Sequence, residues 1–194
     1  RGPPISKPLY SSAASYVYNR QAYVNSNNAH WEKVYQTKNF DSVSWYTSHL
    51  KSSLSIISKL NTDLDKSIID IGGGESTLLD DLIIKGHTNL SVIDISPSAI
   101  KFLQKRLESH FDKIGWHIGD ITDYKFSDNQ FDLWHDRAVF HFLTDNESRV
   151  KYKNLMYCEK HIKTRINPIQ RLPGDKRREY IYILHSDNKT LNFG

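Results

Sequence analysis

Apolar residues along the chain follow two spacings, and together these predict alternating strands and helices. Short Ile-rich runs at residues 67–71 and 90–95 are typical of strands that are buried on both faces. Apolar positions three or four apart predict amphipathic helices at residues 46–61 and 76–85. The middle of the chain is therefore expected to fold as helix, strand, helix, strand.

The rest of the pattern continues this succession. Ser96 and Pro97 supply an N-cap and a first-turn proline, so a third helix is expected to begin there. The other expected elements are a short helix at residues 29–36, strands at 115–121 and 131–140, a helix at 147–158 and a fifth strand at 179–186. This order predicts an α/β fold with a Rossmann-like, doubly wound, mostly parallel sheet.

Length and composition indicate one domain. The chain has 194 residues, of which 38% are hydrophobic, and this suits a single globular core at residues 29–186. Residues 1–28 contain no acidic residue, and we expect them to be a disordered or processed leader. Residues 187–194 are expected to form a C-terminal tail.

Charge and cysteine content limit the classes of function. The 26 Lys and Arg residues exceed the 22 Asp and Glu residues by only four, which does not indicate nucleic-acid binding. Seven basic residues near the C-terminus could form an RNA-binding patch, but a solvated tail is the favoured interpretation: Lys160, Lys163, Arg165, Arg171, Lys176, Arg177 and Arg178. The single cysteine excludes an intrachain disulfide and a Cys-based zinc site.

The same features bear on compartment and partners. A single cysteine favours a reducing compartment, so we expect a cytoplasmic protein. The acid-poor, Ser-rich leader leaves a mitochondrial location as the alternative. No apolar run approaches the roughly 20 residues that a membrane helix needs, so no membrane association is expected, and a monomer is the expected state.

Three successive glycines, Gly72, Gly73 and Gly74, directly follow the first predicted strand. Glycines permit positive φ and let a ligand approach the backbone closely. Ligands of doubly wound sheets bind at the carboxyl ends of the strands, where this turn is expected to lie. A dinucleotide fingerprint beginning at Gly72 needs a glycine at position 77, where Thr77 stands. We therefore expect a nucleotide-like cofactor, with NAD disfavoured; a tight strand-to-helix turn without a ligand is the alternative.

The pattern of Asp70, Gly72 and Gly74 resembles the first motif of the class I S-adenosylmethionine-dependent methyltransferases, D/E-x-G-x-G-x-G. Ser76 replaces the third glycine of that motif. The resemblance implies a methyltransferase that uses S-adenosylmethionine as cofactor and binds it with Asp70 and the three glycines.

Two more acids follow the next two predicted strands. Asp94 ends the second strand about 20 residues after the glycines, where a carboxylate can accept hydrogen bonds from both hydroxyls of a ribose. By the resemblance, Asp94 grips the ribose and Ile95 lies beside it. The resemblance also implies that the Asp120 side chain contacts the exocyclic amine of adenine, while the backbone N–H of Ile121 meets the ring.

Two longer stretches narrow the resemblance. HWEKVYQTKNFDSVSWY at residues 30–46 and FDLWHDRAVFHFLT at residues 131–144 resemble small methyltransferases of the type 12 group, which includes a lysine methyltransferase of citrate synthase. The resemblance implies that Trp31, Tyr35 and Trp45, together with Tyr46, cover the cofactor cleft; ordinary core packing is the alternative. A protein lysine or a small molecule is the expected methyl acceptor.

Candidate catalytic residues lie at the end of the fourth predicted strand. Asp136 is expected to accept a hydrogen bond from the acceptor or to deprotonate it, because a protonated nucleophile needs a base. His135 is the second candidate, with the alternative that only its backbone carbonyl meets the cofactor. Arg137 would bind a carboxylate or pair with Asp136, and His141 is assigned to packing.

The C-terminal part departs from the family pattern. Members usually end with two further strands that complete a seven-stranded sheet, and after residue 186 too few residues remain for them. We therefore expect the final strands to be missing. The alternative function is that of a catalytically inactive cofactor-binding or interaction protein on a truncated methyltransferase fold.

Overall fold

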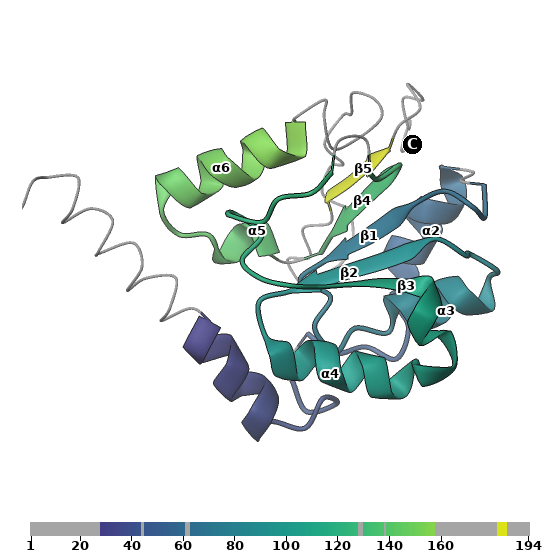
Figure 1. Ribbon diagram of the computed structural model, residues 1–194, viewed down its shortest axis with the longest axis horizontal. Coiled ribbons are helices and arrows are strands. Elements are labelled where there is room, and N and C mark those ends of the chain that lie inside the picture. Colours follow the sequence, from purple (N-terminus) through teal and green to yellow (C-terminus); the bar gives the residue numbers. More distant parts are fainter. Residues whose placement is uncertain are drawn as a thin grey trace, which may run out of the picture.

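One five-stranded sheet organises the protein (Figure 1). The computed structural model describes residues 28–43, 45–60, 63–127, 130–137, 139–157 and 182–185. The strands are β1 (Ile68–Ile71), β2 (Leu90–Asp94), β3 (Ile114–Ile118), β4 (Leu133–Asp136) and β5 (Tyr182–His185). Their order in the sheet is β3-β2-β1-β4-β5, and the first four are parallel. β1 lies in the centre of the sheet. The chain continues from β1 to β2 and β3 on one side and then to β4 on the other side, so the sheet is doubly wound.

Helices cover both faces of this sheet (Figure 1). The helical elements are residues 28–37, α2 (Lys51–Lys59), α3 (Leu78–Ile84), α4 (Pro97–Arg106), the 3₁₀ helix η1 (Glu108–Lys113), the single turn α5 (Val139–Phe142) and α6 (Asn146–Tyr157). The predicted Rossmann-like α/β fold is thereby confirmed.

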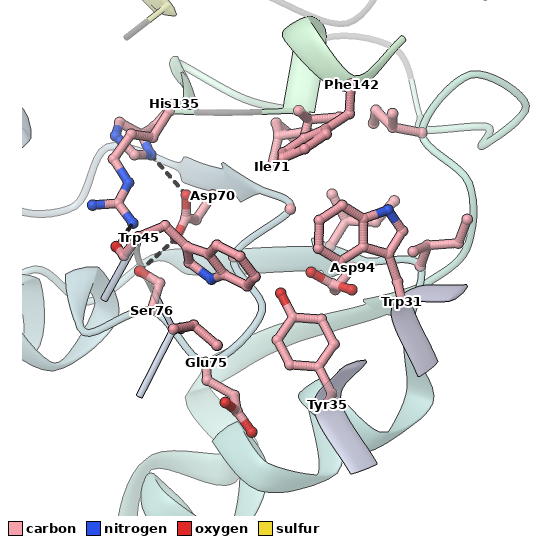
Figure 2. Close-up of a pocket in the computed structure, with 18 of the residues that line it drawn as sticks. Trp31, Tyr35, Trp45, Asp70, Ile71, Glu75, Ser76, Asp94, His135 and Phe142 are labelled. Atoms are coloured by element: carbon pink, nitrogen blue, oxygen red, sulfur yellow. Dashed lines mark hydrogen bonds and ion pairs between the residues drawn. The ribbon is translucent and has the colours of Figure 1, made fainter. Parts of the chain in front are cut away.

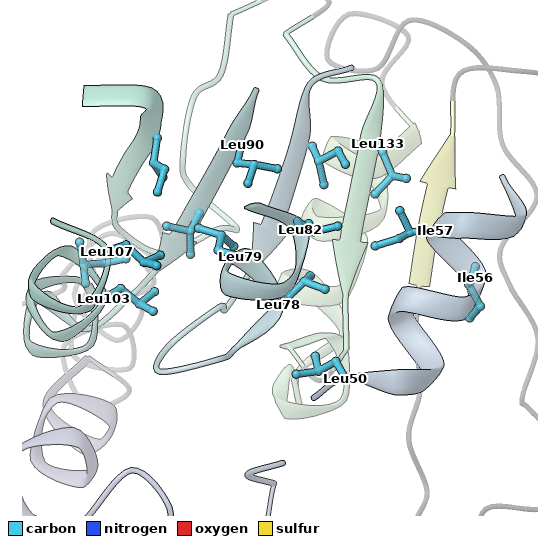
Figure 3. Packing of buried hydrophobic residues seen from close by; sticks show 14 of the residues in the cluster. Leu50, Ile56, Ile57, Leu78, Leu79, Leu82, Leu90, Leu103, Leu107 and Leu133 are labelled. Carbon is cyan, nitrogen blue, oxygen red and sulfur yellow. The ribbon is translucent and has the colours of Figure 1, made fainter. Parts of the chain in front are cut away.

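Strand side chains alternate between two hydrophobic clusters, one on each face of the sheet. Ile68 of β1 belongs to a cluster with leucines and isoleucines of α2, α3 and α4. Figure 3 shows the helix residues Ile57, Leu82 and Leu103 of this cluster. Ile69, the neighbour of Ile68, packs on the opposite face with Trp134 of β4 and Tyr152 of α6. Each Leu or Ile fully removed from water stabilises the fold by about 1.5–3 kcal/mol. The same alternation decides which way the polar side chains at the strand ends point.

The structure confirms the predicted start of α4, the glycine after α3 and the apolar stripe of α2. The Ser96 hydroxyl accepts a hydrogen bond from the Ala99 amide at 3.2 Å, and Pro97 occupies the first turn of α4, as predicted. Gly86 has φ of +92°, consistent with a left-handed residue after the end of α3. The apolar stripe of α2 is also confirmed, because Leu50, Ile57 and Leu60 are buried.

The fifth strand is the antiparallel one in this mostly parallel sheet. β5 lies within the predicted range 179–186, but it pairs antiparallel to β4. The pattern of apolar and aromatic residues predicted the strand, and the structure adds its direction. Within the described part of the chain, no helix is both long and apolar enough to cross a membrane.

Several predictions concern residues outside the described ranges. They are the leader, apart from residue 28, the basic residues between 160 and 178, and the tail at residues 187–194. The domain limits therefore stay predictions.

Candidate functional site

A cavity of about 450 Å³ opens at the carboxyl ends of the parallel strands. Its volume lies in the range of small-molecule sites. Its wall contains every residue predicted to bind the cofactor except Gly74: Trp31, Tyr35, Trp45, Asp70, Gly72, Gly73, Asp94, Ile95, Asp120 and Ile121. These residues come from five separate segments, and Figure 2 shows several of their side chains directed toward the same space.

The glycine turn after β1 is a backbone surface that larger residues cannot form. Gly72 and Gly74 have φ of +62° and +50°, in the left-handed region that favours glycine. A Cβ on Gly72 would overlap the Val139 side chain, and one on Gly74 would overlap the Tyr35 hydroxyl. Gly74 does not line the cavity, but it lies directly under Tyr35, which does.

Arg106 of α4 fixes the continuation of this turn. Its Nη1 donates a hydrogen bond to the Glu75 carbonyl at 3.1 Å, and its Nη2 donates to the Ser76 carbonyl. The guanidinium also pairs with Asp80 at 2.8 Å. Arg106 does not line the cavity, so the turn is held by a side chain outside the cavity wall.

The Asp70 side chain connects the turn to β4 and α2. Asp70 Oδ1 lies 2.7 Å from His135 Nδ1, and Oδ2 accepts a hydrogen bond from the Ser76 hydroxyl at 3.2 Å. The other ring nitrogen of His135 lies 2.8 Å from the Ser53 hydroxyl. Both nitrogens of His135 are therefore used inside the protein. The His135 side chain thus links β4 to β1 and α2, and its catalytic role stays a prediction although His135 lines the cavity.

Asp94 is a buried carboxylate in the cavity wall. It is 5% exposed, its Oδ1 accepts a hydrogen bond from the Ser96 amide at 2.8 Å, and the Gly74 and Ile95 amides also donate to it. Burial raises the pKa of Asp94 to about 7; these hydrogen bonds act against the rise, and the charge of Asp70 adds to it. No cation among the described residues pairs with Asp94, so its oxygens suit hydroxyl donors on a ligand.

Aromatic rings form the opposite wall. The Trp31 ring lies 4.9 Å from Phe142 and 5.9 Å from Trp45, both edge to face, and 6.3 Å from Tyr35. In Figure 2 the Tyr35 hydroxyl is directed toward Asp94. Burial, together with the nearby Asp94 carboxylate, raises the pKa of Tyr35 far above its usual value, so the hydroxyl stays protonated. The aromatic residues expected over the cleft are indeed gathered at it.

Asp120 and Ile121 meet the cavity from the loop after β3. Asp120 Oδ1 accepts hydrogen bonds from the amide and the hydroxyl of Thr122, at 2.8 and 2.7 Å. This bonding closes the loop and leaves Oδ2 as the acceptor for a ligand amine. Ile121 is 6% exposed and packs with the core on that face of the sheet.

Asp136 is not placed as the sequence predicted. It does not line the cavity, it is 0% exposed, and it faces α6 because side chains alternate along β4. Its Oδ1 accepts the Val139 amide at 2.7 Å, and its Oδ2 accepts the Phe140 amide at 3.3 Å and the Tyr152 hydroxyl. A carboxylate surrounded in this way cannot reach a methyl acceptor. We therefore replace the predicted base role of Asp136 by a role in capping α5.

Two further residues of the cavity wall, His141 and Glu75, were not predicted to lie there. His141 was assigned to packing, but it lines the cavity with its ring centroid 4.0 Å from that of Phe142. Burial lowers the pKa of His141, so its ring is neutral at neutral pH. Glu75 also lines the cavity, and burial raises its pKa against the effect of Arg106. The motif pattern contained no signal for these residues, because their placement depends on how α5 and the turn pack.

Comparison with known proteins agrees with this geometry. A family model described as a methyltransferase domain matches residues 68–158, which contain the glycine turn, Asp94 and Asp120. This match, the similar curated proteins and the shared fold together support a class I S-adenosylmethionine-dependent methyltransferase. This methyltransferase family uses S-adenosylmethionine, as the resemblance of the first motif implied. The narrower placement in the type 12 group stays a prediction.

Curated methyltransferases are similar over part of their length. The eEF1A lysine and N-terminal methyltransferase of Bos taurus is 27% identical over 121 residues, covering 62% of this chain and 17% of that protein. EEF1A lysine methyltransferase 2 of Mus musculus is 26% identical over 137 residues, covering 66% of this chain and 56% of that protein. This methyltransferase chain thus spans less than a fifth of the first relative and little more than half of the second.

Solved methyltransferase structures share the fold. Phosphoethanolamine N-methyltransferase 1 of Haemonchus contortus, in complex with phosphoethanolamine and S-adenosylhomocysteine, superposes with a TM-score of 0.59 at 20% identity. That match covers 74% of this chain and 31% of the other. An S-adenosylmethionine-dependent methyltransferase of Clostridium acetobutylicum gives a TM-score of 0.50 at 17% identity, covering 76% and 54%. At these identities the likeness concerns the fold.

Proposed function

We propose that this protein transfers a methyl group from S-adenosylmethionine to an amine of a protein acceptor, with a lysine as the target. The observation that carries the proposal is Asp94, a buried carboxylate without a cation partner among the described residues, set in the cavity wall beside a glycine turn. A nucleoside offers the two hydroxyl donors that such a carboxylate needs.

The residues of the wall suit the parts of this cofactor. Asp94 would hold the ribose, Asp120 and the Ile121 amide the adenine, and the glycine turn the amino-acid part. The wall contains four carboxylates, Asp70, Glu75, Asp94 and Asp120, against one guanidinium, that of Arg137. This excess of negative charge favours a cationic ligand. The cofactor itself supplies an electrophilic methyl group bound to a sulfonium.

The acceptor is inferred from chemistry and from the relatives. Two of them are named as lysine methyltransferases of the protein eEF1A, which supports a protein amine over a small molecule. Methyl transfer is an in-line displacement, so alignment of the amine in the cavity supplies most of the acceleration. The amine must first lose its proton.

The proposal is tested by binding and transfer measurements on the same preparation. Isothermal titration should show one S-adenosylmethionine and one S-adenosylhomocysteine bound per chain. Radiolabelled methyl groups should then appear on a lysine of purified eEF1A or of another protein in a panel of acceptors. Binding without transfer to any acceptor would favour the inactive cofactor-binding protein, and absence of binding would refute the proposal.

His141 is the wall residue that we assign to receiving the proton of the acceptor. Because burial lowers its pKa, the neutral ring is available near pH 7. His141→Gln should lower the rate of methyl transfer at saturating cofactor. The wild-type pH–rate profile should have an inflection at a pH below the usual histidine pKa, and this inflection should be absent in the variant. Cofactor affinity should be nearly unchanged. An unaltered profile in the variant would exclude this role.

A further inference from the structure

Glu32 is the acidic side chain that joins the helix of residues 28–37 to the start of α4. Its Oε2 accepts hydrogen bonds from the Ser96 hydroxyl at 2.5 Å and from the Ser98 amide at 3.1 Å. Its Oε1 accepts from the Ser98 hydroxyl at 2.5 Å and from Gln36 at 2.7 Å. Two of these partners lie more than sixty residues away along the chain, so the contact is tertiary.

These contacts place a carboxylate at the start of α4. The first amides of a helix lack partners within the helix, and its dipole favours a negative charge at this end. Burial acts to raise the pKa of Glu32, but the hydrogen bonds from Ser96, Ser98 and Gln36 outweigh it, and the pKa lies below its usual value. Glu32 is therefore ionised at neutral pH, which is the form that all these donors require.

Ser96 joins this contact to the cavity. Its hydroxyl donates to Glu32, while its backbone amide donates to Asp94 Oδ1 at 2.8 Å. One turn along the helix from Glu32, the Tyr35 hydroxyl lies over Gly74 and beside Asp94. The residue before Glu32, Trp31, forms part of the aromatic wall. Ser96 therefore bonds both to the helix of residues 28–37, through Glu32, and to Asp94 in the cavity wall.

We propose that Glu32 is a positioning residue, which fastens the helix of residues 28–37 over the cofactor cavity and couples its closure to the orientation of Asp94. The part that concerns the cofactor rests on the proposed function, and the part that concerns the fastening does not. Glu32 touches neither the cavity nor a reacting atom, and it acts through Ser96, Ser98, Trp31 and Tyr35.

Hydrogen exchange of the ligand-free protein tests the fastening directly. In Glu32→Gln, amides of residues 28–37 should exchange roughly tenfold faster than in the wild type, while amides of β1 keep their rates. Ser98→Ala should have a smaller effect, and the double variant should exchange no faster than the sum of the two free-energy changes predicts, because both remove the same contact. Glu108→Gln, at an exposed glutamate of η1, is the matched control and should change nothing.

The dissociation rate of S-adenosylhomocysteine tests the coupling. It should be roughly tenfold faster from Glu32→Gln than from the wild type or the control, because the closed helix retards release. Equal exchange rates at residues 28–37 would overturn the fastening. Faster exchange with an unchanged dissociation rate would overturn the coupling to the cavity. If the wild type binds no S-adenosylhomocysteine, the proposed function and the coupling both fail, and the exchange rates alone decide the fastening.

Discussion

An Asp94→Asn variant should bind S-adenosylmethionine roughly 10 to 100 times more weakly than the wild-type protein. The carboxylate can accept hydrogen bonds from both ribose hydroxyls, and a hydrogen bond to a charged group contributes about 1.5–3 kcal/mol. The carboxamide keeps one acceptor oxygen and turns an N–H₂ donor toward hydroxyls that must themselves donate. Isothermal titration should show the same loss for S-adenosylhomocysteine, because the two ligands have identical ribose groups.

An exposed acid outside the cavity provides the control for this substitution. Asp112→Asn, in η1, removes the same charge at a distance from the wall and should leave both affinities unchanged. Equal affinity of Asp94→Asn and the wild type would mean that the ribose is bound elsewhere. The proposed orientation of the cofactor would then be wrong, even if the protein transferred methyl groups.

The titration of Asp94 adds a pH dependence with a definite sign. Burial raises its pKa to about 7, and hydroxyl donors require the ionised form, so binding below pH 7 releases a proton. Affinity should rise by up to about tenfold per pH unit toward pH 7 and then level off. In the ligand-free protein the folded pKa lies above the reference value of 3.8, so the free energy of unfolding should decrease as the pH rises from about 4 to about 7. Asp94→Asn should flatten both profiles.

The cofactor side of the site was predictable because its residues occupy local motifs at strand ends. Asp70, the glycines, Asp94 and Asp120 each follow a strand with a clear apolar pattern. Carboxyl ends of parallel strands meet at one edge of a sheet, so sequence spacing translates directly into proximity there. The burial of these residues in one cavity wall required no information about side-chain packing.

The acceptor side depends on packing that the sequence pattern does not determine. His135 and Asp136 are adjacent in β4, so their side chains lie on opposite faces of the sheet. His135 therefore contacts Asp70, and Asp136 contacts Tyr152. The sequence pattern at residues 131–140 did not show where this strand begins. It therefore could not predict which of the two side chains faces the cavity side of the sheet. The tertiary contact of Glu32 was not predicted for a related reason. A single glutamate in an amphipathic helix is expected to be solvated unless its tertiary partners are known.

Asp136→Ala should lower the free energy of unfolding by about 3 kcal/mol and the melting temperature by roughly 6–12 °C. The carboxylate is 0% exposed and accepts hydrogen bonds from the Val139 and Phe140 amides and the Tyr152 hydroxyl. Alanine removes the acceptor that these buried and half-buried donors use, and it also removes the cap of α5. Urea denaturation followed by circular dichroism measures the loss.

Asparagine at the same position separates the two roles considered for Asp136. Asp136→Asn keeps an acceptor for the Val139 amide, and its N–H₂ group can donate to the Tyr152 oxygen, so the expected loss is only about 1 kcal/mol. A base would show the reverse, because the amide cannot take a proton and transfer would fall sharply with little loss of stability. If Asp136→Ala unfolds within about 0.5 kcal/mol of the wild type, the capping role is wrong. Near-normal transfer by a folded Asp136→Asn would confirm that the proton of the acceptor leaves by another residue.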